Sequence, residues 1–135
     1  MLFRSLYQGA RPPHGNVLRR SRVDALVLCA QEYQPAALLF PGVQVLYAPL
    51  DDAELTAGEW EIAKQASKRV EGIIKTGGRV LVTCMQGLNR SGLVVAMTLH
   101  RLTGLPGHRC VEAVQARRAN ALMNESFVHA LAGLR

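Results

Sequence analysis

The chain has 135 residues, of which 49% are hydrophobic and 19% are charged, and this composition excludes a disordered protein and fits one domain over residues 1–135. No apolar run approaches the roughly 20 residues of a membrane span, and no apolar stretch with a cleavage site follows the arginines of residues 1–20. The formal charge of +6 is typical of a mildly basic enzyme, and attraction to anionic partners is the alternative. The basic clusters at Arg19, Arg20 and Arg22 and at Arg117 and Arg118 are too short for a nucleic-acid-binding tail. We expect a cytoplasmic protein without membrane association.

Apolar runs predict the strands of the fold. They are nearly continuous in hydrophobic character, which is typical of strands covered on both faces of a sheet. The first precedes the turn residues Gly9 to Pro13. In chain order the predicted strands are Leu2–Tyr7, Asp24–Cys29, Val43–Ala48 and Arg79–Thr83.

Helical spacing of apolar residues predicts a long helix over Ala57–Lys75, which ends at Gly77-Gly78. Three further helices are predicted at Ser91–Thr103, His108–Arg118 and Ser126–Leu134. Strands alternating with helices early in the chain, and helices clustered late, indicate an α/β fold. We expect a central, mostly parallel sheet with helices on both faces and a helical C-terminal half.

The segment from Val80 to Val95, VLVTCMQGLNRSGLVV, passes from a strand through a glycine-containing loop into a helix. Such a loop points backbone N–H groups inward, and the helix N-terminus adds positive potential, so the junction predicts a phosphate site. Gly87 allows a backbone angle that most residues resist. The same field favours the thiolate of Cys84, the predicted nucleophile. Six residues later, Arg90 offers a two-pronged guanidinium for the phosphoryl oxygens.

Two further roles complete the predicted chemistry. The Ser91 hydroxyl, next to Arg90, can stabilise the departing thiolate of Cys84, and it can also cap the helix. A leaving alkoxide needs a proton, and the pair Asp51-Asp52 follows the predicted strand Val43–Ala48 at its carboxyl end, where ligands bind in such sheets. One of these two carboxyl groups is therefore the expected general acid. We expect no metal ion and no cofactor.

Cys29, Cys84 and Cys110 are the three cysteines of the chain. Their odd number and the absence of a CxxC pair or a histidine cluster argue against a disulfide framework and a zinc site. We expect Cys29 and Cys110 to be small buried hydrophobic residues.

The motif Cys-x5-Arg-Ser, with an aspartate loop upstream and a helix ending in GGRV, resembles the dual-specificity branch of the protein tyrosine phosphatase superfamily. The resemblance extends from LYQGA through APLDD to NALMNESFVHAL, where Asn124 and Phe127 match an Asn-x-x-Phe signature. It implies that the residues from Met85 to Asn89 (Met85, Gln86, Gly87, Leu88 and Asn89) supply the amides that bind the substrate phosphate. It also implies that Asp52, 32 residues before Cys84, is the general acid, although a different loop length would leave Asp51 in that role.

One residue departs from this pattern. The family usually has histidine immediately before the cysteine, and this chain has Thr83. Because threonine carries no positive charge, we expect Cys84 to ionise less readily than in the family, with the nucleophile and the arginine intact.

The resemblance implies a phosphorylated protein or peptide substrate, with phosphotyrosine and also phosphoserine or phosphothreonine as targets. An RNA 5′-phosphatase of the same superfamily is an alternative, because GLNRSG resembles its loop pattern. RNA is less favoured, since the sequence offers no aromatic stacking platform and no basic tract. A phosphate-binding pseudophosphatase is the alternative outside enzymes, and the sequence leaves the oligomeric state open.

Overall fold

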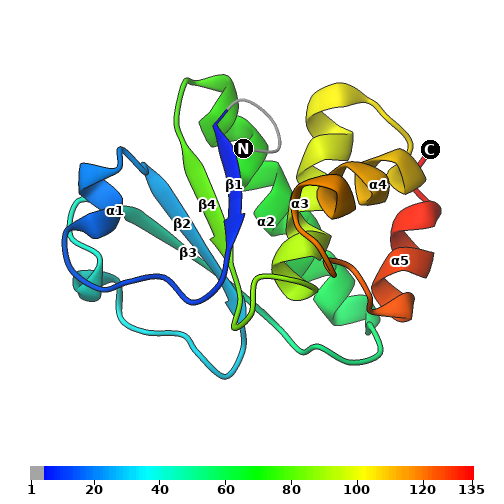
Figure 1. The fold of residues 1–135 in the computed structure, drawn as a ribbon, viewed down its shortest axis with the longest axis horizontal. Coiled ribbons are helices and arrows are strands. Elements are labelled where there is room, and N and C mark those ends of the chain that lie inside the picture. The colour runs from blue at the N-terminus through cyan, green and yellow to red at the C-terminus, as the bar shows by residue number, and fades with distance from the viewer. Residues whose placement is uncertain (1–4) are drawn as a thin grey trace.

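A parallel sheet lies at the centre of the protein. The structure, a computed structural model, describes residues 5–135, and within them four strands form the sheet in the order β1 (Leu6–Gly9), β4 (Val80–Thr83), β2 (Ala25–Ala30) and β3 (Gln44–Leu50) (Figure 1). Each neighbouring pair is parallel, and Leu28 of β2 is in register with Thr83 of β4. The predicted α/β fold with a parallel sheet is confirmed.

Helices cover both faces of the sheet, but unequally (Figure 1). On one face lie α2 (Ala57–Lys75) and α3 (Arg90–Thr103), and α4 (Gly107–Arg117) and α5 (Glu125–Ala132) pack against α3. The other face carries the short α1 (Val17–Arg20) and the 3-10 turn η1 (Ala37–Leu39). There Leu18 and Phe40 form a smaller core against Leu26 and Leu28 of β2.

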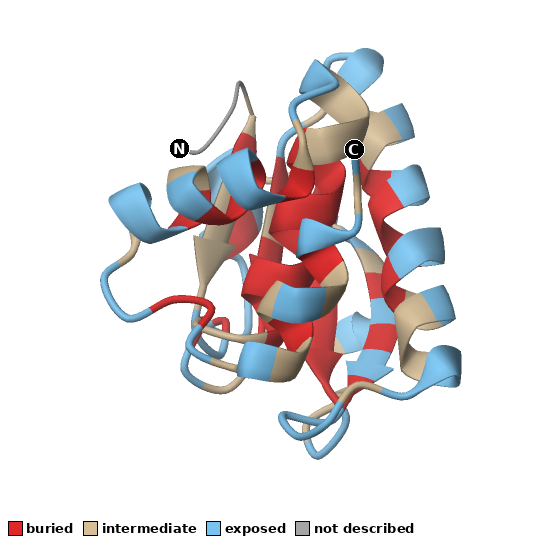
Figure 2. Cartoon of the chain, turned by 90° about the vertical axis from the view of Figure 1, so that its right-hand side faces the viewer, coloured by how far each residue is buried: buried red, intermediate tan, exposed pale blue. Residues whose placement is uncertain are grey.

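Helix α3 is the buried centre of the helical layer (Figure 2). Every residue from Arg90 to Leu99 is buried, because the sheet, α2, α4 and α5 surround the helix. Its central segment Leu93–Met97 is continuously apolar, which is typical of a helix buried on all sides. Arg90 and Ser91 lie at the N-terminal end of this helix, so a buried element of the fold holds both side chains in place.

Helix α2 has the bounds that the sequence predicted. Its start is fixed by a capping box: Thr56 Oγ1 accepts from the Glu59 N–H at 3.1 Å, and Glu59 Oε1 accepts from the Thr56 N–H at 3.3 Å. The other predicted helices differ from the observed ones by one or two residues. The sequence did not predict α1, because four residues are too few to show a helical period.

Two predicted strands need correction. The first strand was predicted at Leu2–Tyr7, of which residues 2–4 lie outside the described residues; the observed β1 continues to Gly9, because Gly9 is in register with Thr83. The strand predicted at Val43–Ala48 is β3, which extends to Leu50 and is covered on one face rather than both. It lies at the edge of the sheet, so buried positions alternate with exposed ones such as Tyr47.

Two of the cysteines are core residues, as predicted. Cys29 and Cys110 are both fully buried and not disulfide-bonded. Burial raises the pKa of the Cys29 thiol well above its usual value, and the nearby Cys84 acts in the same direction, so Cys29 is a neutral hydrophobic group. Over residues 5–135, no helix combines the length and the apolar character needed to cross a membrane.

Candidate active site

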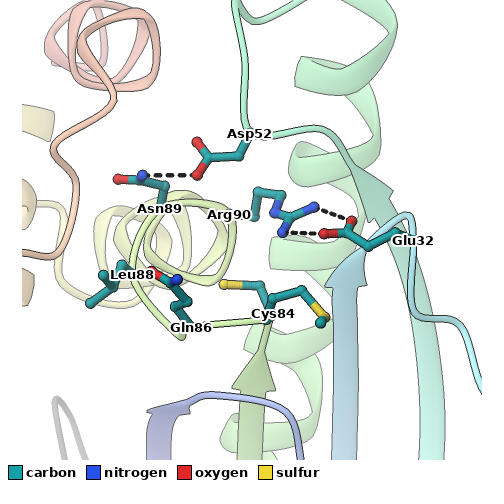
Figure 3. A pocket seen from close by; sticks show the side chains of 8 residues that line it. Glu32, Asp52, Cys84, Gln86, Leu88, Asn89 and Arg90 are labelled. Atoms are coloured by element: carbon teal, nitrogen blue, oxygen red, sulfur yellow. Dashed lines mark hydrogen bonds and ion pairs between the residues drawn. The ribbon is translucent and has the colours of Figure 1, made fainter.

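A cavity of about 260 Å³ opens where β2, β3 and β4 end (Figure 3). Arg90 and Cys84 face it from one side and Asp52 from the other. Ser91 and Gly87 are not among the residues that line the cavity. The side chains that line the cavity are Glu32, Asp52, Cys84, Met85, Gln86, Leu88, Asn89 and Arg90. Seven of these eight were singled out from the sequence, and Glu32 was not.

The loop between β4 and α3 is held by its carbonyl groups. The Arg11 N–H donates to Met85 O at 3.4 Å, and the Leu122 N–H donates to Leu88 O at 3.2 Å. The Arg118 guanidinium donates to Gln86 O at 3.1 Å and to Gly87 O at 2.5 Å. All four carbonyl groups therefore point away from the cavity, toward donors that surround the loop.

The orientation of the carbonyl groups decides where the amides point. In a trans peptide the N–H of one residue is directed opposite to the C=O of the residue before it. Outward carbonyls from Met85 to Leu88 thus turn the N–H groups from Gln86 to Asn89 inward. None of these four N–H groups has an acceptor among residues 5–135. Together with the N-terminal end of α3, they form a cradle for an anion.

Gly87 is required at its position by two constraints. Its φ of +72° lies in the left-handed region that favours glycine. A Cβ atom there would also lie 2.5 Å from Gly9 C and 2.7 Å from Ala10 N, because the loop passes directly over the end of β1. The prediction that Gly87 adopts an unusual backbone angle is confirmed.

The guanidinium of Arg90 is held on two edges and free on the third. Nη1 and Nη2 donate to the two oxygens of Glu32, Nη2 at 2.8 Å, and Nη1 also donates to Leu50 O at 3.2 Å. Of the five N–H donors, these contacts leave Nε–H and one Nη2–H without an acceptor among residues 5–135. Those two lie side by side on one edge of the planar group, which is the arrangement that binds two phosphoryl oxygens.

Glu32 is a site residue that the sequence reasoning missed. Hydrogen bonding from Arg90 lowers the pKa of Glu32, and its own backbone N–H lowers it further, so the carboxylate stays ionised opposite the guanidinium. In return Glu32 raises the pKa of Arg90 above an already high value. Glu32 follows β2 as Asp52 follows β3, and the strand-end rule that indicated Asp51-Asp52 would have indicated Glu32 as well.

Cys84 lies at the bottom of the cavity and is 5% exposed. Its Sγ is 3.3 Å from Ser91 Oγ, so the two groups are in contact as the sequence suggested. Thr83 does not join them. Its hydroxyl donates its one proton to Val27 O, across the sheet, at 2.8 Å.

The two adjacent aspartates have different surroundings. Asp52 faces the cavity, and its oxygens accept from Asn89 Nδ2 at 3.0 Å and from Asn124 Nδ2 at 2.9 Å. The Asp51 side chain is not among the groups that line the cavity, and its backbone N–H donates to Glu59 at the start of α2. The geometry therefore favours Asp52 over Asp51 for the predicted role of general acid, in agreement with the spacing of the motif.

The sequence reasoning also did not assign site positions to Gln8, Arg118 and Asn124. Gln8 is a polar residue in an apolar strand, and Arg118 and Asn124 come from the segment between α4 and α5. Of these three residues, only Asn124 belongs to a recognised sequence motif, the Asn-x-x-Phe signature. In the part of the chain that the structure describes, no three His, Cys, Asp or Glu side chains come together as metal ligands.

Comparison with known proteins points to one family. Residues 6–135 match the model of the dual specificity phosphatase catalytic domain. The dual specificity protein phosphatase 1B of Arabidopsis thaliana is 34% identical over 62 residues, a segment that covers 46% of this chain and only 37% of that relative.

Solved structures agree with this match over nearly the whole chain. Human DUSP28 is 26% identical with a TM-score of 0.84, covering 97% of this chain and 88% of its own. A mouse putative dual specificity phosphatase complexed with zinc tungstate has the same identity and TM-score, with 97% and 82% covered. Tk-PTP in its active form shares the fold at 23% identity and a TM-score of 0.84, with 97% and 91% covered. The chain belongs to the family of dual-specificity phosphatase catalytic domains.

Proposed function

We propose that this chain hydrolyses phosphomonoesters of proteins through a phosphocysteine intermediate on Cys84. The observation that carries the proposal is the convergence on one cavity of the Cys84 sulfur, four inward amides and the free edge of Arg90. A tetrahedral anion fits such a set of donors. The family model supports the reaction class, and the tungstate of the mouse relative is itself a tetrahedral oxyanion.

The reaction proceeds in two steps. The Cys84 thiolate attacks phosphorus, the bond from phosphorus to the ester oxygen breaks, and the leaving oxygen takes a proton from Asp52. Water then attacks the phosphocysteine, giving a proton back to the Asp52 carboxylate, and the S–P bond breaks to release phosphate. Arg90 and the amides stabilise the charge on the equatorial oxygens in both steps, and the Ser91 hydroxyl stabilises the thiolate that departs in the second.

The charges of the cavity favour a single phosphate group. The loop side chains that line it, Met85, Gln86, Leu88 and Asn89, are uncharged, and Arg90 is the one cation among the described lining residues. A substrate with several consecutive phosphates, such as a 5′-triphosphorylated RNA, meets no second cation there. We therefore propose a phosphorylated protein as the substrate and RNA as the weaker candidate.

A hydrolysis assay with para-nitrophenyl phosphate, phosphopeptides and triphosphorylated RNA tests the proposal. The wild-type chain should hydrolyse the first two, and Cys84→Ser should abolish turnover. Acid quenching followed by mass spectrometry should detect phosphate on the peptide that contains Cys84. Turnover that survives Cys84→Ser would contradict the mechanism. If the chain released phosphate only from RNA, the substrate would be RNA rather than a phosphorylated protein. If it bound phosphopeptides without hydrolysing them, it would be a pseudophosphatase.

A further inference from the structure

Gln8 lies at the end of β1, directly beneath the phosphate-binding loop. Its side-chain nitrogen Nε2 is 3.0 Å from Gly87 O, 3.5 Å from Leu88 O and 3.1 Å from Ser91 Oγ. Ser91 is fully buried, and its hydroxyl is in turn 3.3 Å from Cys84 Sγ. A chain of contacts thus runs from β1 through Ser91 to the sulfur.

The direction of these hydrogen bonds follows from the two carbonyl groups. Carbonyl oxygens only accept, so the end of the Gln8 amide that faces Gly87 and Leu88 must be the NH₂ group, because its oxygen would meet two acceptors with no proton between them. The same NH₂ group reaches Ser91 Oγ, which must therefore accept. A hydroxyl that accepts from Gln8 keeps its own proton free, and Cys84 Sγ is its other polar neighbour among residues 5–135.

Without Gln8 the Ser91 oxygen loses its donor, and nothing then fixes the direction of the hydroxyl proton, because a hydroxyl rotates freely about its C–O bond. With Gln8 present, the NH₂ group donates to Ser91 Oγ and to Gly87 O, a carbonyl that also accepts from Arg118 Nε. The amide oxygen of Gln8 is buried and finds no donor among residues 5–135, so the residue is a poor choice for stability alone.

We propose that Gln8 is a positioning residue that aims the Ser91 hydroxyl proton at Cys84 and so stabilises the thiolate. The role of Gln8 in catalysis rests on the proposed function, but its effect on the ionisation of Cys84 in the absence of substrate does not. The contribution matters more in this chain because Thr83 replaces a cationic neighbour and gives its proton to Val27 O. Thus Ser91, directed by Gln8, is the nearby side-chain hydroxyl that can donate to Cys84.

The test is a double-mutant cycle read out by alkylation. Gln8→Met keeps the length of the side chain and removes the donor. The rate of Cys84 alkylation by iodoacetamide, measured against pH, should fall about fivefold at pH values below the midpoint of its profile, the loss of one ordinary hydrogen bond. Ser91→Ala should give a similar fall, and the double variant should fall no further than Ser91→Ala. Because alkylation needs no phosphate ester, the result stands even if the chain hydrolyses none.

Gln34→Met is the matched control, since Gln34 also donates to backbone carbonyls, Leu28 O at 3.0 Å and Ala30 O at 2.7 Å, without contacting Ser91. Its effect on alkylation should be the same with and without Ser91. Gln8→Asn, too short to reach Ser91, should reproduce Gln8→Met and serves in its place if Gln8→Met does not fold. The proposal would be overturned if the Gln8 variants did not change the alkylation rate of Cys84. It would also be overturned if they lowered that rate equally in the wild-type and the Ser91→Ala chains.

Discussion

Two carboxylates at the ends of neighbouring strands line the same cavity, but one contacts a cation and the other contacts neutral amides. Glu32, after β2, is paired with Nη1 and Nη2 of the Arg90 guanidinium, and this contact lowers the pKa of Glu32. Asp52, after β3, is held by the neutral amides of Asn89 and Asn124 and touches no cation in the described structure (Figure 3).

The difference assigns separate tasks to chemically similar groups. A guanidinium favours the ionised form of the carboxylate that it contacts, so Glu32 is suited to holding Arg90 in place. The two amides orient the Asp52 carboxyl group and bring no cation to it, and we propose that this residue protonates the leaving group. Three of the following predictions test this division of tasks and one extends it to the end of β4, beginning with the largest expected effect.

Asp52→Asn should reduce kcat about 10²–10⁴-fold for alkyl phosphates such as phosphoserine, since an alkoxide needs a proton to depart. For para-nitrophenyl phosphate the loss should be much smaller, because that leaving group departs unprotonated. Steady-state kinetics with both substrates measures the ratio. Asp51→Asn is the matched control and should leave the ratio near its wild-type value. The assignment to Asp52 is wrong if the two aspartates exchange these behaviours.

Glu32→Gln should lower kcat/KM about tenfold, and by a similar factor for both leaving groups. The amide can donate to or accept from its surroundings but no longer forms a two-pronged ion pair, so the free edge of Arg90 is less well aligned with the phosphoryl oxygens. A dependence on the leaving group would make Glu32 a participant in proton transfer. A rise in kcat/KM would show that removing a negative charge outweighs the loss of alignment.

Thr83→His extends the comparison to β4, whose last residue, directly before Cys84, is the uncharged Thr83. A cationic ring beside the sulfur should move the alkylation profile of Cys84 toward lower pH and raise the alkylation rate severalfold at neutral pH. Thr83→Val should leave the profile unchanged, because the threonine proton already goes to Val27 O. Circular dichroism should accompany both variants, since the position is fully buried. An unmoved profile in the histidine variant would contradict the account of Thr83.

The smallest expected effect is the contribution of the Glu32–Arg90 ion pair to the stability of the fold, which should depend on pH. Because the folded-state pKa of Glu32 is lowered, the ion pair should stabilise the fold fully above the ordinary glutamate value of 4.5, and this contribution should vanish as the pH falls through the lowered value. Half of the Glu32 side chain is exposed, so we expect wild type to exceed Glu32→Gln by only about 2 °C in Tm at neutral pH. A difference that grows in acid would reverse the sign and refute the pairing.

Sequence patterns were most reliable where a local period or motif fixed the structure. The helix Ala57–Lys75 has a long apolar stripe and a capping box, and its bounds agree with the prediction. The junction from Cys84 to Arg90 could be identified because one contiguous segment supplies the strand end, the glycine and the helix start. Family membership also followed from motifs along the chain, and the family match supports it.

The tertiary structure alone decided what comes from distant segments. Gln8 and Arg118 lie 79 and 31 residues from Gly87, yet both bind its carbonyl oxygen, and no local pattern encodes such contacts. The edge position of β3 depends on strand order, which periodicity does not contain. The sequence by itself determined which residues can perform chemistry. Only the packing of β1, β2 and the α4–α5 segment around the loop determined which groups hold Arg90, Ser91 and the amides in position, because a hydrogen bond depends on distance in space rather than along the chain.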